Sequence, residues 1–150
     1  MKKIFLSLFL PSILVLASFN AVWAQVPFSD NLKEYNIRLI SNEQGISTFS
    51  GVNQGIQLKI IAENERIVKM VLMFDADDGS AKRSAYAMEC INIISNLMPQ
   101  KIKSLTEAQD MLYKKMAAME TEHGRDVFIY DGLRFECNSN NGMMNIRITE

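Results

Sequence analysis

Alternating apolar and polar residues predict strands in the first half of the chain. The clearest example begins at Ile56, because Ile56, Leu58 and Ile60 alternate with Gln57 and Lys59. Strands are expected over residues 35–41, 46–50, 56–62 and 67–74, with turns at 42–45, 51–55 and 63–65. Four strands in close succession favour an antiparallel sheet.

The fourth of these strands is the most apolar. One of its faces carries Val68, Met70, Leu72 and Phe74, and the other carries Ile67, Val71 and Met73. Strands that are buried on both faces have nearly continuous apolar sequences. We therefore expect this strand to lie at the centre of the sheet and to be covered on both sides.

Beyond residue 80, apolar residues recur at the spacing of a helix. A first helix is expected over residues 81–98, with Asp78 as its N-cap and Pro99 at its end. A second helix starts at the capping box Ser104-Leu105-Thr106-Glu107 and extends to about residue 122. The inward-facing residues are expected to be Ala87, Cys90, Ile91, Ile94 and Met98 in the first helix, and Ala108, Met111, Leu112, Met116 and Met119 in the second.

The pattern of strands returns near the C-terminus. Residues 127–130 and 133–137 flank Asp131-Gly132, a dipeptide that favours a two-residue hairpin turn. After a turn at 138–142, alternation resumes up to residue 149. We therefore predict a single α+β domain, in which an antiparallel sheet is packed by two helices on one face in the order ββββ-αα-βββ.

The first 24 residues have the layout of a secretory signal peptide. Lys2 and Lys3 give a positive start, residues 4–17 are almost wholly apolar, and Ala24 is a small residue suited to a cleavage site. An uncleaved membrane anchor is the alternative, but the apolar core is shorter than the roughly 20 residues of a spanning helix. We expect cleavage after Ala24, a soluble domain over residues 25–150 and a periplasmic location.

The composition of residues 25–150 argues against several functions. Because Lys2 and Lys3 leave with the signal, 14 basic and 17 acidic residues remain, and they are well mixed. No basic run suggests binding of nucleic acid. Neither a phosphate-binding loop nor a dinucleotide fingerprint occurs in the sequence, so no cofactor is expected.

Cys90 and Cys137 are the two cysteines of the chain. An even number of cysteines in an exported protein favours a disulfide. Cys90 lies on the apolar face of the first expected helix, and Cys137 shares a strand face with Leu133 and Phe135. Both therefore point toward the helix–sheet interface, where we predict a Cys90–Cys137 disulfide; two buried free thiols are the alternative.

The sequence offers few candidates for catalysis. His123 is the only histidine, and it follows the second expected helix. A pair of carboxylates would allow glycoside hydrolysis, and the candidates are Glu63, Glu65, Asp75, Asp77 and Asp78. These acidic residues lie in expected turns, where solubility and turn formation also account for them. We therefore expect a protein without enzymatic activity and with no catalytic residues.

Methionine suggests one metal hypothesis. Met116, Met119 and His123 share a helical face, and thioether and imidazole groups suit Cu(I). Ordinary core packing explains the same spacing. We therefore assign no metal ligands.

The leading hypothesis from the sequence is a small periplasmic module that binds another protein, for example an inhibitor or immunity protein against a toxin or a cell-wall hydrolase. The turns at 42–45, 51–55 and 138–142 are candidate contact regions. The alternatives are a small-molecule or lipid carrier, with a cavity between sheet and helices, and a carboxylate-based hydrolase.

Overall fold

The computed structural model describes residues 32–75, 79–119 and 124–150. The elements follow the predicted order of four strands, two helices and three strands. Their bounds are β1 (Arg38–Glu43), β2 (Ile46–Asn53), β3 (Ile56–Glu63), β4 (Arg66–Asp75), α2 (Ser80–Leu97), α3 (Leu105–Met119), β5 (Arg125–Tyr130), β6 (Leu133–Asn140) and β7 (Met143–Thr149). The predicted α+β fold is thus confirmed.

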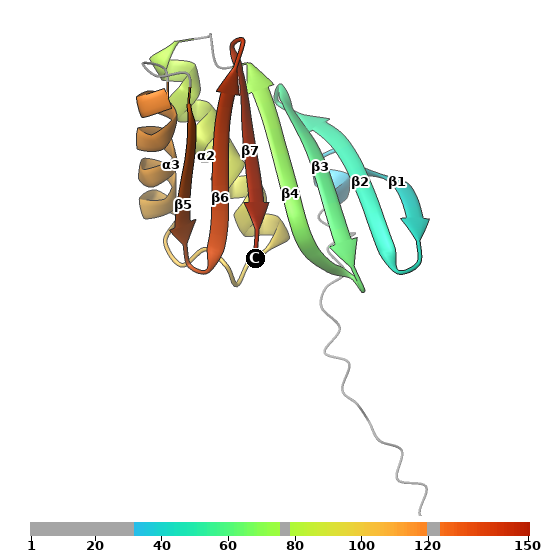
Figure 1. Ribbon diagram of the computed structural model, residues 1–150. Helices are drawn as coiled ribbons and strands as arrows, with labels where there is room; N and C mark the ends of the chain where they lie inside the picture. The colour runs from blue at the N-terminus through green and yellow to red at the C-terminus, as the bar shows by residue number, and fades with distance from the viewer. Residues whose placement is uncertain (1–31, 76–78, 120–123) are drawn as a thin grey trace, which may run out of the picture.

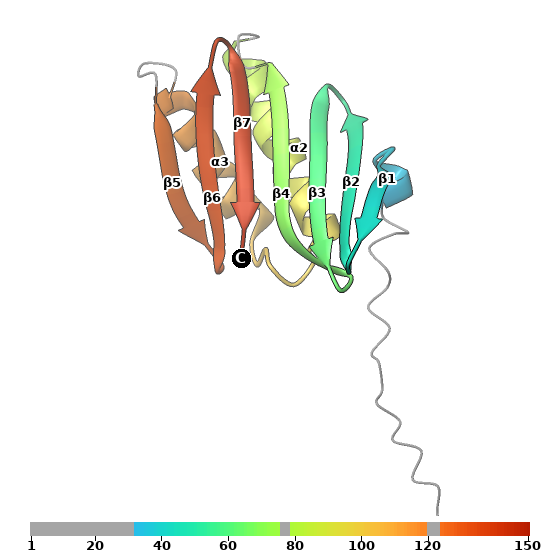
Figure 2. The same cartoon turned by 45° about the vertical axis from the view of Figure 1, so that its right-hand side comes forward.

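The seven strands form one antiparallel sheet in the order β1-β2-β3-β4-β7-β6-β5. Two meanders, β1–β4 and β5–β7, join where β4 pairs with the last strand, β7 (Figure 1). Both helices lie on the same side of the sheet, as Figure 2 shows from a second angle. The opposite side carries no helix among the described residues.

Five two-residue hairpins set the register of the sheet. The residues of each hairpin turn have positive φ; Asp131 and Gly132, for example, have φ values of 49° and 82°. Such turns match the right-handed twist of paired strands. The predicted Asp131-Gly132 hairpin is therefore confirmed, whereas the other turns are shorter than the sequence suggested.

Alternate residues of the strands face the helices and form the core. On β3 these are Ile56, Leu58 and Ile60, none more than 1 % exposed. The other meander contributes Phe135, whose ring stacks on Phe128 with centroids 4.7 Å apart. The two helices contribute Ala87, Cys90, Ile91, Ile93, Ile94, Leu97, Ala108, Leu112, Met116 and Met119, all buried.

The start of α3 joins the helix to the sheet. The Glu107 N–H donates to Ser104 Oγ at 3.4 Å, which is the N-cap contact that the capping box predicts. The Tyr130 hydroxyl on β5 donates to the Ser104 carbonyl oxygen at 3.1 Å and to Glu107 Oε2 at 3.3 Å. The same turn of chain therefore caps α3 and holds the end of β5.

Two local expectations were wrong. The predicted turn at 51–55 begins only at Gln54, because Gly51 lies within β2, where a side chain would come within 2.7 Å of the Asn36 carbonyl oxygen. The N-cap of α2 is Gly79 rather than Asp78, which lies outside the described residues. Gly79 has a φ of 85°, a conformation that suits glycine.

The fourth strand also differs from its prediction. It is central in the sheet, but helices cover only one of its faces, and Val71 and Met73 on the other face are half-buried. A register shift against β3 leaves Val68 as an extra residue, so that Ile67 rather than Val68 joins the buried face of Met70. A β-bulge of this kind reverses the alternation of faces along a strand.

Candidate functional site

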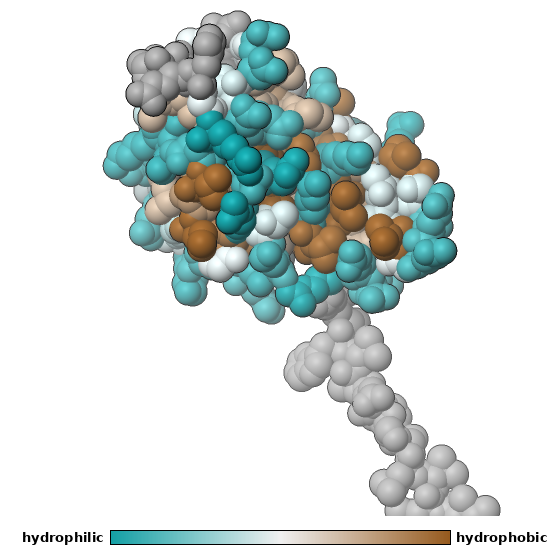
Figure 3. Space-filling model, viewed as in Figure 1, coloured by the Kyte–Doolittle hydropathy of each residue, from teal (hydrophilic) through white to brown (hydrophobic). Residues whose placement is uncertain are grey.

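The uncovered face of the sheet exposes apolar side chains at several separate places. Ile46, Val52, Val127, Ile129 and Met143 point away from the helices, and Ile129 is 68 % exposed. Figure 3 shows these apolar areas over the outer and central strands, divided by polar residues. Single exposed apolar side chains are common on protein surfaces, so they point to a contact surface only in combination with other features of the same face.

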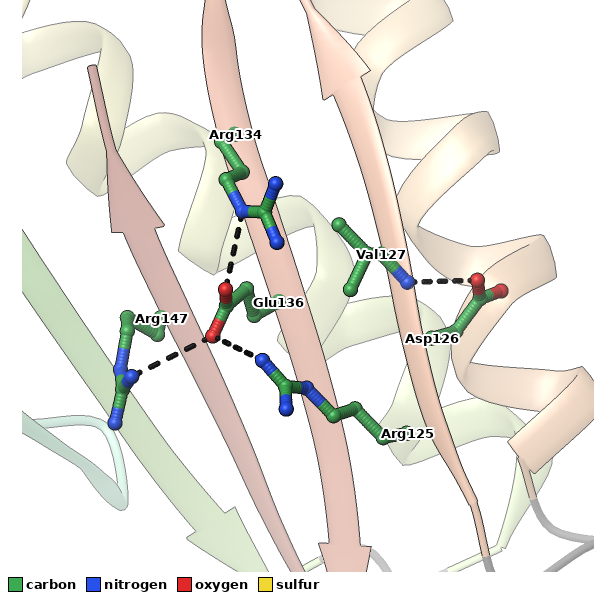
Figure 4. Close-up of polar contacts among 6 residues, drawn as sticks. All are labelled: Arg125, Asp126, Val127, Arg134, Glu136 and Arg147. Atoms are coloured by element: carbon green, nitrogen blue, oxygen red, sulfur yellow. Dashed lines mark hydrogen bonds and ion pairs between the residues drawn. The ribbon is translucent and has the colours of Figure 1, made fainter.

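Three arginines from three neighbouring strands surround Glu136 on this face (Figure 4). Arg134 Nε and Arg125 Nη2 each lie 3.0 Å from a Glu136 carboxylate oxygen, and Arg147 Nη1 lies at 3.4 Å. The strand register brings them together, because Glu136 of β6 pairs with Arg147 of β7 and with Val127 of β5. Three positive charges around one negative charge leave a local excess of two, so the cluster can attract a further carboxylate.

The cluster has a consequence for pH dependence. The hydrogen bond from Arg134, together with the charges of Arg125 and Arg147, holds the pKa of Glu136 below its usual 4.5, against a smaller opposing effect of burial. A lowered pKa in the folded state stabilises the protein above the unfolded pKa, and this contribution disappears as the pH falls below 4.5. In a ¹³C NMR titration we expect Glu136 to titrate below 4.5 and Arg134→Gln to raise that pKa. An unchanged pKa in the variant would contradict this assignment.

A polar hollow of about 350 Å³ lies on the other side of the molecule, beside α2. Its lining includes two carboxylates, Glu34 and Glu89, and the carboxamides of Asn53, Asn92 and Asn96. Asn53 Nδ2 donates to Glu89 Oε1 at 2.8 Å, and Asn96 donates to the Tyr35 hydroxyl. Burial raises the pKa of Tyr35, and the nearby Glu34 and Glu89 add to that effect. This lining suits a small polar molecule and does not suit a lipid chain.

The two cysteines lie at the helix–sheet interface, as predicted, and both are fully buried. The structure contains them as free thiols, so the predicted disulfide is not formed in it. Burial raises the pKa of Cys90, and the charge of a Cys137 thiolate would raise it further. Burial also raises the pKa of Cys137 to about 12. Neither thiol is therefore suited to act as a nucleophile at neutral pH.

The other candidate residues are not brought together. Glu63, Glu65 and Asp75 are exposed at strand ends and turns, whereas Asp77, Asp78 and His123 lie outside the described residues. Met116 and Met119 are buried in the core, so core packing accounts for the methionine spacing. Within residues 32–75, 79–119 and 124–150, no group of three or more His, Cys, Asp or Glu side chains is arranged to hold a metal ion.

The arginine cluster was not identified from the sequence. Arg134 and Glu136 are two residues apart on a predicted strand, which places them on one face. The positions of Arg125 and Arg147 depend on the register between strands, which the turns at residues 131–132 and 141–142 determine. The spacing of Arg134 and Glu136 on one strand was therefore the only feature of the sequence that could have indicated the cluster.

Comparison with known proteins gives no relative: no protein-family model, curated protein or solved structure matches the chain. None of the described helices has the length and apolar character needed to cross a membrane. The function must therefore be argued from the surface itself.

Proposed function

We propose that this chain is a non-enzymatic periplasmic module, exported by its signal peptide, that binds another protein through the uncovered face of its sheet. The observation that carries the proposal is the combination on this face of exposed apolar side chains, Ile129 above all, with the three-arginine cluster. Arginine and large apolar residues supply much of the binding energy in protein interfaces.

An inhibitor or immunity protein fits this description, because such a role needs a complementary surface and no reactive group. Strand pairing is continuous from β1 across the sheet to β5, so the uncovered face is held in shape by the backbone. A preorganised surface loses little conformational entropy on binding. The partner would be a toxin or a cell-wall hydrolase.

Carrying a lipid would require an apolar cavity between the sheet and the helices. The side chains described there, including Leu72, Leu112 and Phe135, have no exposed surface and pack against one another. The polar hollow beside α2 opens at the surface and is lined by carboxylates and carboxamides. Protein binding is therefore the function that the described surface favours over lipid transport.

Capture from a periplasmic extract of the source cells tests the proposal. Immobilised residues 25–150 are expected to retain one protein in stoichiometric amount. At least one of Val52→Lys, Ile129→Lys and Met143→Lys, which lie on three parts of the uncovered face, is expected to weaken that binding by more than about 1 kcal/mol, about fivefold. The measurement is the amount retained, by quantitative mass spectrometry.

Met88→Lys is the matched control. Met88 is 50 % exposed and lies on α2, on the opposite side of the molecule from Met143, which is 41 % exposed. It should leave retention unchanged. Absence of a stoichiometric partner, or equal retention by all four variants, would contradict the proposal.

A further inference from the structure

The two edges of the sheet differ in how well they can accept another strand. At one edge, β1 contains a bulge, because its register against β2 shifts between Leu39 and Ser41. At the other edge, the six residues of β5 pair with β6 without any shift. Bulges protect sheet edges from pairing, whereas a regular edge presents its outward backbone N–H and C=O groups. On β5 the Val127 N–H donates to Asp126 Oδ1 at 2.7 Å, so an incoming strand must replace this contact. Among the described strands, none pairs with the outer side of β5.

β5 is also held firmly in place. Lys115 Nζ on α3 lies 2.9 Å from Asp126 Oδ2, which ties the helix to the start of the strand. The bonds from Tyr130 to Ser104 and Glu107 tie its end. An edge fixed at both ends is preorganised for backbone pairing with an incoming segment.

The uncovered side of β5 carries Arg125, Val127 and Ile129 in succession. The Arg125 side chain is 61 % exposed and belongs to the cluster that has an excess of two positive charges. An added strand would place its own side chains directly opposite these three. Charge complementarity therefore calls for a carboxylate opposite Arg125 and apolar side chains opposite the other two.

We infer that the outer edge of β5 binds an extended segment of the partner protein, which adds an eighth, antiparallel strand to the sheet. Read from its N-terminus, the segment carries an apolar residue opposite Ile129, an apolar residue opposite Val127 and an acidic residue opposite Arg125, with one residue between each. The inference rests on the proposed function, because it specifies where and how the partner is recognised. Antiparallel pairing is the arrangement of every strand pair in the sheet.

A synthetic peptide provides the probe. The acetylated, amidated heptapeptide Thr-Val-Thr-Val-Thr-Glu-Thr has the expected order, and Thr-Glu-Thr-Val-Thr-Val-Thr has the same composition in reverse. In ¹H–¹⁵N NMR titrations of residues 25–150, the first peptide is expected to shift the amides of residues 125–130, and the second to bind more weakly. A third peptide with Lys in place of Glu should also bind more weakly.

Variants of the two edges complete the test. Arg125→Gln is expected to weaken binding of the first peptide about two- to fivefold, because one exposed ion pair is lost. Ile129→Asp is expected to weaken binding of the first peptide about fivefold or more. The substitution removes an apolar cross-strand pair and adds a negative charge next to a peptide that is itself negatively charged. Ile40→Asp is the matched control, since Ile40 is 65 % exposed at the β1 edge, and it should leave binding unchanged.

Absence of shifts at residues 125–130, equal binding of the reversed peptide, or equal loss in Ile40→Asp would overturn the inference. Any of these results would still be compatible with the proposed function, provided that Val52→Lys or Met143→Lys weakens retention of the captured partner. Conversely, a peptide that binds β5 as expected supports strand addition even before a partner is captured.

Discussion

Phe135→Ala is expected to lower the free energy of unfolding by about 3–5 kcal/mol, the range for a large aromatic side chain removed from a core. Phe135 has no exposed surface, and its ring stacks on Phe128. Its strand neighbour Ile148 on β7 is also buried, so little can move in to fill the cavity. A small domain is stable by only about 5–15 kcal/mol, so this single change removes a large share of its stability.

Urea unfolding followed by circular dichroism measures the effect. The midpoint should fall while the slope stays unchanged, because the same surface is exposed on unfolding. Ile129→Ala on β5 is the control, and it should change the free energy by less than about 0.5 kcal/mol, since Ile129 is exposed. A loss below about 1 kcal/mol for Phe135→Ala would mean that the helix–sheet interface is not packed as described.

The element order was predictable because each segment has one dominant apolar period. Ile56, Leu58 and Ile60 alternate, and all three are buried on one face of β3. In α3, Leu112 and Met116 are four residues apart and face the core together. These are local patterns, and a local pattern depends only on neighbouring residues.

The errors arose where distant residues decide the structure. Gly51 resembles a turn residue, but it is required inside β2 because the chain at Asn36 and Ile37 passes close to it. The bulge at Val68 depends on pairing with β3, and no feature of the neighbouring sequence predicts it. The sequence likewise did not predict that one side of β4 is uncovered, because Val71 and Met73 on that side are as apolar as core residues.

The surface illustrates the same limit. Arg125, Arg134 and Arg147 are spread over 23 residues of sequence, and each alone is an ordinary exposed charge. Only the hairpin registers bring them around Glu136. A cluster built across strands can be predicted from a sequence only after every turn length is known.

If the chain is exported to an oxidising compartment as proposed, we expect a disulfide between Cys90 and Cys137 to raise the free energy of unfolding by about 4 kcal/mol relative to the reduced chain that the structure shows. The bond would join α2 to β6 and close a long loop, which restricts the unfolded chain. Both thiols are buried side chains of the same helix–sheet core.

The raised pKa values also predict when the bond forms. The thiolate is the reactive species in disulfide exchange, and burial disfavours it for both cysteines. With oxidised glutathione as the oxidant, two thiols become one disulfide as the glutathione is reduced to two thiols. We expect this reaction to be slow on the folded, reduced chain and fast when the chain refolds from urea.

Thiol counting and urea unfolding measure both effects. Protein directed to the periplasm of an expression host, purified and then unfolded should show no free thiol, and its unfolding midpoint should fall when a reductant is added. Cys90→Ala is the control, because it cannot form the disulfide. Its unfolding midpoint should therefore not respond to reductant, even if the smaller side chain lowers the stability of the core. Two titratable thiols in the unfolded periplasmic protein would show that the core keeps both sulfurs reduced, as free buried side chains, and that packing alone stabilises the helix–sheet interface.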